Sequence, residues 1–419
     1  MMRRSRPAAA RGLDSPYAWF RLGVAIVLST IGGVGMWSVV VVLPAVQADF
    51  HLDRGEASLP FTLTMIGFGL GGVLMGRVAD RRGIMLPILV GAGALGLGYV
   101  LASLAPGLPV FSAAYLLIGT FGVAATFAPL LADISFWFER YRGIAVALCA
   151  AGNYVSGAIW PTLIEAMVRT YGWRTTHLAI GIFAVVVMPP LALLLRGRPP
   201  QRAATATAGT SAERRIELRP AALQSLLAVA GLACCVAMSM PQVHIVAYCS
   251  DLGYGATSGA RMLSLMLGFG IISRIASGFL ADRLGGVATL VIGSAAQMLA
   301  LVLYLLADGL TSLFVISALF GLFQGGLVPS YAMIIRESFP MQQAGTRVGV
   351  VMMMTLLGMA LGGWISGLIF DVTGSYRIAF ANGVVWNAVN LLIALYLLAR
   401  SPAVMRRHGL VPAARSSAE

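Results

Sequence analysis

The chain is poor in charge and contains no lysine. Only 11% of its 419 residues are charged and 58% are hydrophobic, and all 29 basic residues are arginine. A water-soluble domain carries roughly a quarter charged residues, so this composition excludes a soluble globular protein. The sequence also lacks a phosphate-binding loop of the form GxxxxGK[ST], which excludes that route to ATP hydrolysis.

Cysteine is scarce as well. The four cysteines, Cys149, Cys234, Cys235 and Cys249, lie in or beside apolar runs. They show neither metal-ligand spacing nor a disulfide framework, and they are typical of small packing residues. With no nucleophile–base pair and no metal cluster in the sequence, we expect neither an enzyme nor a cofactor.

The net charge of +13 does not indicate a nucleic-acid partner. The arginines form short clusters between apolar runs, as topology signals of membrane proteins do. The partner that this pattern favours is the lipid bilayer.

The apolar residues fall in runs of about 20, the helix length that crosses a hydrocarbon core about 30 Å thick. The short alternating segments typical of a β-barrel are not seen. We predict an all-α membrane protein with twelve transmembrane helices in two six-helix halves. The expected spans are 19–43, 57–76, 84–105, 109–131, 143–166, 175–195, 222–249, 259–281, 286–307, 311–334, 347–369 and 378–399.

The spans divide the chain into five parts. A cytosolic tail at 1–18 precedes the first half at 19–195, and a cytosolic linker at 196–220 leads to the second half at 221–400 and a cytosolic tail at 401–419. The linker is rich in Arg, Pro, Ala and Thr and has no apolar periodicity, which is typical of a flexible connection. We read the basic N-terminal tail as retained, not as a cleaved signal peptide.

Arginine bias predicts the orientation. The tails and one set of loops hold 23 arginines; the opposite loops hold only Arg54, Arg169, Arg174, Arg261 and Arg377. The remaining arginine, Arg274, lies inside a span. Because arginine accumulates on the cytosolic side, we expect both termini in the cytosol of a multi-pass plasma (inner) membrane protein.

The two halves repeat each other. "GRVADRRG" at 76–83 returns as "GFLADRLG" at 278–285, "FGVAATFAP" at 121–129 as "FGLFQGGLVP" at 320–329, and "YGWR" at 171–174 as "GSYR" at 374–377. A parallel repeat with a site between the halves is a transporter architecture.

The repeated loop, G-x-x-A-D-R-x-G, resembles the signature of the major facilitator superfamily. The resemblance covers nearly the whole chain, and it implies a gating role on the cytoplasmic side. The residues concerned are Gly76, Asp80 and Arg81 in the first copy and Gly278, Asp282 and Arg283 in the second. The alternative is a solvated basic loop that only sets topology.

Arg274 is the charge that needs an explanation. It lies 15 residues into its predicted span, about 22 Å at 1.5 Å per residue. A guanidinium at the bilayer centre costs at least about 2.5–3.5 kcal/mol, so it requires an acceptor. An anionic substrate would supply one, and a carboxylate matches its planar fork. The alternative is a structural arginine, but Asp133 and Glu165 lie near span ends and not at its level.

A narrower resemblance points the same way. "WFERYRGIAVALCAAG" at 137–152 resembles the fifth-span signature of the monocarboxylate transporter family, departing from it at Ala147 and Cys149, and "DSPYAW" at 14–19 loosely resembles that family's entry to the first span. Arg274 falls where this family has its substrate arginine. The related oxalate–formate exchangers also place a basic residue in this helix. The resemblance implies alternating-access transport of a small monocarboxylate, such as a 2-hydroxy or 2-keto acid.

Two departures affect coupling. Animal members place an aspartate one turn before the arginine, where this chain has Gly270, and a lysine late in the first span, where it has Trp37. The usual proton-carrying pair is therefore missing. A tryptophan would suit a bulkier or more apolar acid, and we include Trp37 among the substrate-binding candidates.

Further candidates complete the predicted site. Asn153 and Tyr154 in the fifth span, and Gln324 and Tyr331 in the tenth, could contact substrate or only bond other helices. His244 could carry a coupling proton or be a satisfied structural histidine.

We therefore expect a secondary transporter of small monocarboxylates that functions as a monomer, coupled to a proton or a counter-anion. The alternatives are a major facilitator exporter of drugs or other metabolites, with Arg274 joining the halves, and an organic-anion exchanger.

Overall fold

The computed structural model describes residues 12–197, 216 and 218–401. Its helices are α1 (Pro16–Gly32), α2 (Val34–Phe50), α3 (Arg54–Arg82), α4 (Met85–Ser103), α5 (Leu108–Leu117), the π-helix η2 (Ile118–Val123), α6 (Ala128–Trp137), α7 (Arg142–Leu194), α8 (Pro220–Asp251), α9 (Gly255–Leu284), α10 (Gly286–Leu306), α11 (Leu310–Gln324), α12 (Leu327–Ser338), α13 (Met341–Thr373) and α14 (Tyr376–Ala399). Within this described part the chain is all-helical, which confirms the predicted fold class.

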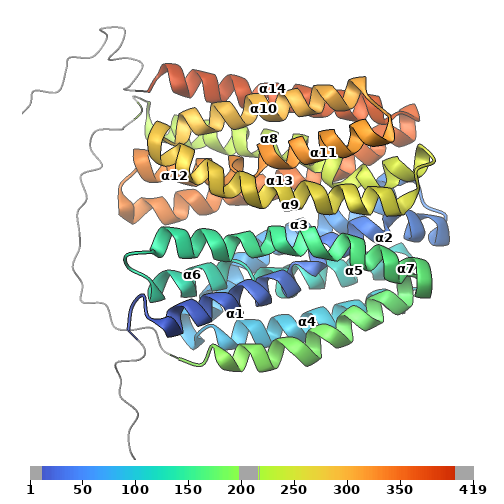
Figure 1. Cartoon of the computed structure of the whole chain (residues 1–419), viewed down its shortest axis with the longest axis horizontal. Helices are drawn as coiled ribbons and strands as arrows, with labels where there is room; N and C mark the ends of the chain where they lie inside the picture. The colour runs from blue at the N-terminus through green and yellow to red at the C-terminus, as the bar shows by residue number, and fades with distance from the viewer. Residues whose placement is uncertain (1–11, 198–215, 217, 402–419) are drawn as a thin grey trace, which may run out of the picture.

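The helices run side by side along one axis (Figure 1). Helices α1 to α7, in blue to green, lie on one side, and α8 to α14, in yellow to red, lie on the other. The end of the molecule where α1 begins and α14 ends is called the proximal side here, and the opposite end is the distal side. Most of the predicted linker and tails lies outside the described residues.

Eleven helical segments of the described chain are long and apolar enough to cross a membrane, where the sequence predicts twelve. The difference lies in α7, which has 53 residues. That is about 80 Å at 1.5 Å per residue, far longer than a bilayer is thick. Gly172 inside it has non-helical dihedral angles (φ 77, ψ 162), and Figure 1 shows the chain turning back on itself. This one segment therefore contains the fifth and sixth predicted spans.

Three other spans are interrupted. Gly33 joins α1 to α2, Phe127 separates η2 from α6, and Gly325 and Gly326 separate α11 from α12. Each of these spans still crosses as one segment, but its regular helical hydrogen bonding is interrupted at the break. Interrupted helices at membrane depth are tolerated where protein or a cavity surrounds them.

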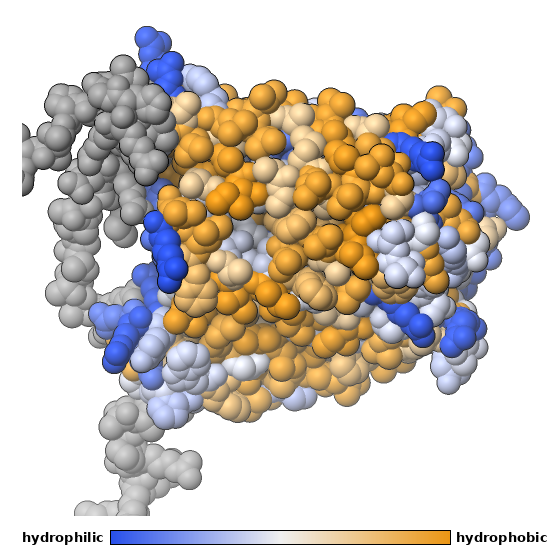
Figure 2. All heavy atoms as spheres, turned by 45° about the horizontal axis from the view of Figure 1, so that its top comes forward, coloured by the Kyte–Doolittle hydropathy of each residue, from blue (hydrophilic) through white to orange (hydrophobic). Residues whose placement is uncertain are grey.

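The surface matches a membrane protein. Figure 2 shows a broad band of apolar side chains around the middle of the visible face, with polar side chains gathered at both ends. Large apolar side chains such as Phe279, Val186 and Leu392 are more than half exposed. In water such a surface would aggregate, whereas lipid covers it without a penalty.

The two halves meet from the distal side to about mid-height. The main contacts pair α3 with α13 and α7 with α9, and α2 adds a smaller contact with α8 and α9. Nearer the proximal side, several glycines of these helices face open space, while Gly71 and Gly152 pack only against their own half. A methyl group would meet no atom within 4 Å at Gly72, Gly76, Gly143, Gly278, Gly345 or Gly349. The halves are therefore packed together distally and apart proximally.

Candidate functional site

Arg274 lies on α9 at the level where the α7–α9 contact ends. Its guanidinium carbon is 5.3 Å from the centre of the Tyr154 ring on α7. The side chain is half-buried, and no described residue accepts a hydrogen bond from it or pairs with it as an anion. A cation–π contact contributes about 0.5–2 kcal/mol, less than the cost of placing the charge at this depth. The guanidinium fork is thus available to an acceptor that the protein does not supply.

Gly270 makes this arrangement sterically possible. A methyl group at Gly270 would lie 2.5 Å from Cε1 of Tyr154, so any larger residue would displace the ring. The family's aspartate is thus replaced by a residue that lets an aromatic ring approach α9. Arg274 therefore contacts the Tyr154 ring of the opposite half, where the resemblance leads one to expect a carboxylate on its own helix.

Gln324 lies beside the same part of α9. A methyl group at the next residue, Gly325, would lie 2.4 Å from the Gly270 carbonyl oxygen and 3.0 Å from the Arg274 backbone nitrogen. The Gly325 N–H donates to the Ser273 hydroxyl (3.1 Å). These contacts pack the break between α11 and α12 against the turn of α9 that carries Arg274.

The Gln324 side chain is fully buried and only partly satisfied. Its Oε1 accepts from Nε2 of Gln242 on α8 (2.7 Å), while its own Nε2 has no partner among the described residues. Leaving a buried amide donor without a partner costs about 1–3 kcal/mol. A substrate oxygen that accepts a hydrogen bond from Nε2 would recover this free energy.

Trp37 lies one turn distal to Tyr154 in the same interface. A methyl group at Gly157 on α7 would lie 3.0 Å from the Trp37 ring and 2.3 Å from Leu267 on α9. Trp37 is 3% exposed, and its Nε1 has no acceptor among the described residues. Together with Arg274 and Gln324 it makes a third unsatisfied donor, and a set of donors without acceptors suits an anion that only accepts.

The two carboxylates that the sequence offered as partners of Arg274 are engaged elsewhere. Asp133 on α6 takes a bidentate contact from Arg21 on α1, with Nε to Oδ2 at 2.7 Å and Nη2 to Oδ1 at 2.9 Å. Glu165 on α7 accepts from the Thr257 hydroxyl on α9 (2.6 Å). Neither forms an ion pair with Arg274.

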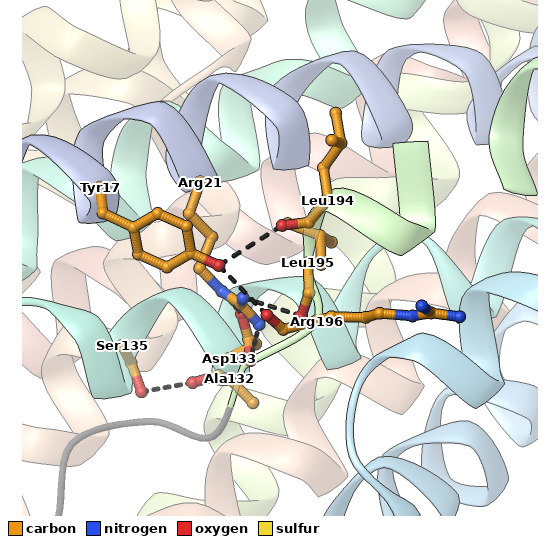
Figure 3. A network of polar contacts seen from close by, with 8 residues as sticks. All are labelled: Tyr17, Arg21, Ala132, Asp133, Ser135, Leu194, Leu195 and Arg196. Carbon is orange, nitrogen blue, oxygen red and sulfur yellow. Dashed lines mark hydrogen bonds and ion pairs between the residues drawn. The ribbon is translucent and has the colours of Figure 1, made fainter. Parts of the chain in front are cut away.

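The Arg21 network ties three segments together on the proximal side (Figure 3). Arg21 is fully buried, donates through Nη1 to the Leu195 carbonyl (2.8 Å) and lies 4.6 Å from the Trp137 ring. It therefore fastens α1 to α6 and to the end of α7. From the sequence we counted Arg21 only as a topology signal and missed this structural role. A charge at the sixth residue of an apolar helix already indicates a buried partner.

The two short motifs that resemble the monocarboxylate transporter family touch each other. The Asp14 carboxylate accepts from the backbone N–H groups of residues 139–141, at 3.1 to 3.4 Å. Trp19 packs edge-to-face on Phe138 (5.0 Å), and Tyr17 does so on Trp137 (5.2 Å). The entry to α1 thus braces the loop that leads into α7, the helix that carries Tyr154.

The other two predicted contacts of the substrate have contacts within their own halves. Asn153 packs within the first half, where a methyl group at Gly33 would lie 3.0 Å from its Oδ1. The Tyr331 hydroxyl lies 2.7 Å from Oδ1 of Asn390 and 3.1 Å from the Ala230 carbonyl, all in the second half. The structure brings Trp37, Tyr154, Gln324 and Arg274 to one region, and the substrate contacts of Asn153 and Tyr331 stay predictions.

His244 is fully buried on α8, toward the distal side. Its Nε2 bonds the Gly363 carbonyl on α13 (2.7 Å), while its Nδ1 has no partner among the described residues. The first bond fixes the proton on Nε2, which leaves Nδ1 as a free acceptor.

The predicted proximal gate is not engaged in this conformation. Asp80, Arg81, Asp282 and Arg283 are exposed, and no hydrogen bond or ion pair joins them to another described residue. A methyl group at Gly76 or Gly278 would meet nothing within 4 Å, as noted above. Their gating role stays a prediction for the opposite, proximally closed conformation.

A distal lock that the sequence did not reveal joins the halves. The Asp371 carboxylate on α13 accepts from the backbone N–H groups of Arg54 and Gly55, which open α3, both at 2.7 Å. The Arg54 side chain is 7% exposed and pairs with Asp251 on α8 (Nη2 to Oδ2, 2.9 Å). A carboxylate at a helix N-terminus satisfies free N–H groups and the helix dipole.

Replacing Asp371 with Asn is expected to weaken this lock, because the amide carries no charge. A helix cap contributes about 1 kcal/mol, so the distal-open population should rise about fivefold. The measurement is an electron-spin distance between labels at the exposed distal positions Tyr171 and Leu252, in a background without the native cysteines. Asp308→Asn is the matched control, since Asp308 pairs with Arg377 inside the second half. An unchanged distance distribution in Asp371→Asn would contradict the lock.

Comparison with known proteins identifies the family. The sequence matches the Major Facilitator Superfamily over residues 25–316 and 289–418. The chain belongs to this superfamily. Members of the superfamily are membrane transporters and not enzymes, and the many apolar helices make this chain a multi-pass membrane protein.

Curated relatives refine the position within the superfamily. Monocarboxylate transporter 13 of Rattus norvegicus is 29% identical over 336 residues, which cover 77% of this chain and 74% of the relative. Monocarboxylate transporter 11 of Mus musculus is 25% identical over 390 residues, covering 89% and 86%. An uncharacterised transporter of the superfamily from Bacillus subtilis is 25% identical over 370 residues, covering 84% and 88%.

Solved structures agree on the fold. A bacterial homologue of the human lysosomal transporter Spinster, in an inward-facing and occupied conformation, superposes with a TM-score of 0.69 at 14% identity, covering 92% of this chain and 97% of that one. A variant of a nucleoside transporter superposes with a TM-score of 0.70 at 12% identity, covering 91% and 99%. These similarities concern the fold alone.

Proposed function

We propose that this transporter carries small monocarboxylate anions by alternating access, and that Arg274 binds the substrate carboxylate. The observation that carries the proposal is a half-buried arginine between the two halves that has an aromatic ring beside it and no anion among the described residues. Trp37 and Gln324 add unsatisfied donors at nearby positions. The relatives named as monocarboxylate transporters support the same substrate class.

The proposal includes orientation and coupling. Arginine bias places the proximal side in the cytosol, so the open proximal side would correspond to an inward-facing state of a plasma-membrane (inner-membrane) protein acting as a monomer. Tyr154 and Arg274 would separate when the halves rock apart distally, which frees the guanidinium for a substrate that enters from outside. Coupling would be to a proton, for which His244 is the sequence-derived candidate, or to a counter-anion.

One observation favours a second candidate function. The contact between Arg274 and Tyr154 crosses from one half to the other, as expected if the arginine only joins the halves in an exporter of drugs or other metabolites. Such a protein would not need a carboxylate in its substrate.

Counterflow into proteoliposomes separates the two. The panel is labelled lactate, pyruvate and an aromatic acid, with a lipophilic cation as the competing substrate class. The proposal predicts accumulation of a monocarboxylate and no accumulation of the cation, and the reverse result would contradict it. Because Trp37 fills the space distal to Arg274 with an aromatic face, the aromatic acid should be carried at least as well as lactate.

A further inference from the structure

The distal start of α3 already holds a carboxylate. Oδ1 of Asp371 accepts from the Arg54 N–H group and Oδ2 accepts from the Gly55 N–H group, each at 2.7 Å. Both donors belong to the first half of the protein, whereas Asp371 belongs to the second half. This helix end is therefore a carboxylate site that a residue of the opposite half fills while the distal side is closed.

The other donors at this helix end are satisfied within the first half. Asp53 and Glu56 form a capping box, in which the Asp53 side chain accepts from the Glu56 N–H and the Glu56 carboxylate accepts from the Asp53 N–H (3.3 Å). The Ala57 N–H donates to the Asp53 carbonyl (3.0 Å). Of these first donors of α3, only the Arg54 and Gly55 N–H groups therefore depend on the second half.

The Arg54 side chain adds a buried cation at the same helix end. It is 7% exposed, and its Nη2 donates to Asp251 on α8 (2.9 Å). Its Nε and Nη1 are buried without a partner among the described residues. The guanidinium carbon is 5.1 Å from the centre of the Phe370 ring and 5.8 Å from that of the Tyr376 ring. The anion and both rings around this cation come from the second half.

Distal opening separates these contacts together. Asp371 and Asp251 move away with the second half, while the guanidinium and the two N–H groups stay on α3. Asp49, another acid of the first half near this helix end, is already paired with Arg174. Free N–H groups and the helix dipole favour an anion at a helix N-terminus, and the guanidinium of Arg54 provides charge-assisted hydrogen bonds to a carboxylate. The open state therefore presents an anion site at its distal mouth.

Gly55 leaves room for a carboxylate at this site. A methyl group there would lie 3.0 Å from Oδ2 of Asp371 and 2.7 Å from Cδ2 of Leu368, so a larger side chain would crowd the bound oxygen. The internal repeat, with its offset of 202 residues, places Ala256 and Thr257 at the positions of Arg54 and Gly55. Of the two copies, only α3 combines the arginine with the glycine.

We propose that the start of α3 is an entry site for the substrate carboxylate, formed by Arg54 and the N–H groups of residues 54 and 55 when the halves separate distally. The substrate takes the place of Asp371 there. Arg274 lies 19 residues beyond the distal start of α9 at Gly255, about 28 Å deeper at 1.5 Å per residue, so the two sites are distinct. This inference rests on the proposed monocarboxylate function, and it names the arginine that the incoming anion meets first.

The entry site links substrate binding to opening. A ligand shifts a two-state equilibrium by its differential affinity for the two states. A monocarboxylate that binds α3 only after Asp371 has left favours the distally open state. The substrate therefore competes with the distal lock.

The test measures distal opening by lactate in Arg274→Ala protein, which lacks the deeper arginine. Spin labels at Tyr171→Cys and Leu306→Cys, exposed distal positions on opposite halves, report the open and closed fractions in detergent, in a background without the native cysteines. Lactate at ten times its dissociation constant should raise the open-to-closed ratio about elevenfold. Lactamide, and sodium chloride at equal ionic strength, should leave the ratio nearly unchanged. Equal opening by either of them would overturn the proposal.

Variants of Arg54 locate the response. Arg54→Gln should lose most of the lactate effect. Arg54→Lys keeps a cation for Asp251 and hence the closed state, but it loses the planar fork, so its half-effect concentration should rise severalfold. Arg261→Gln removes an exposed distal arginine of α9 and is the matched control that should respond fully. A full response in Arg54→Gln, or an unchanged half-effect concentration in Arg54→Lys, would overturn the proposal.

Asp371→Asn tests the competition itself. Its distal-open population should be about fivefold higher, as predicted above, and apparent affinity is proportional to the competent fraction. The half-effect concentration of lactate should therefore fall about fivefold. All variants are first checked for a monodisperse profile in detergent. An unchanged or higher half-effect concentration in Asp371→Asn would also overturn the proposal.

The outcome separates this proposal from the substrate proposal. If lactate opens the distal side through Arg54 while counterflow finds no monocarboxylate transport, the anion site stands and the substrate class fails. If monocarboxylates are carried and Arg54→Gln opens with the full lactate response, the substrate class stands and the entry site fails.

Discussion

Arg274→Ala should strongly reduce monocarboxylate uptake in proteoliposomes. The guanidinium provides charge-assisted hydrogen bonds to the substrate, and losing a hydrogen bond to a charged group costs about 1.5–3 kcal/mol. That corresponds to a fall of about 10- to 100-fold in the initial rate at sub-saturating substrate. The fall should be accompanied by unchanged protein folding, because the described chain gives Arg274 only one ring contact, to Tyr154.

Arg274→Lys is the informative companion to that variant. It keeps the positive charge and loses the planar fork, so uptake should fall about tenfold and remain measurable. Tyr154→Phe serves as the control, since it keeps the ring that faces the guanidinium. Wild-type uptake in Arg274→Ala would show that the arginine does not bind substrate and would favour a purely structural role.

Arg21→Met should produce the largest loss of stability. Removing one partner of a buried ion pair costs about 3–5 kcal/mol, because the remaining charge is left uncompensated. Here Asp133 would keep no cation within the Arg21 network, and the Leu195 carbonyl would lose its donor. The thermal midpoint of the purified protein, measured by intrinsic fluorescence in detergent, should fall by several degrees.

The double variant Arg21→Met with Asp133→Asn tests the physical reason. If uncompensated charge causes the loss, neutralising Asp133 should restore part of the thermal midpoint, and a double-mutant cycle should give a coupling energy above about 1 kcal/mol. Additive losses would show that packing around Trp137 matters more than the ion pair.

The sequence predicted the helices well because their signal is length and apolarity. The expected span at 222–249 corresponds to α8 at Pro220–Asp251, and the one at 286–307 to α10 at Gly286–Leu306. The helix count differed only where Gly172 turns the chain inside one continuous segment. The predicted boundary between the spans 143–166 and 175–195 falls at this turn.

The interactions between distant residues were harder to predict. Arg274 and Tyr154 could each be selected from sequence, as a buried charge and as a polar aromatic residue in a span. Their contact depends on Gly270, which in sequence reads only as a missing aspartate. The contacts of Asp371 with α3 and of Glu165 with α9 join residues from different halves, and no local sequence pattern shows which helix end faces which carboxylate.

Substrate competition between an acid and its amide tests the central claim most directly. The best-transported acid of the counterflow panel and its carboxamide have nearly the same size and shape, and only the acid carries a charge for Arg274. The account predicts that the unlabelled acid competes with labelled acid for uptake and that the carboxamide does not compete at a hundredfold higher concentration. Equal competition by the carboxamide would contradict a carboxylate site at Arg274.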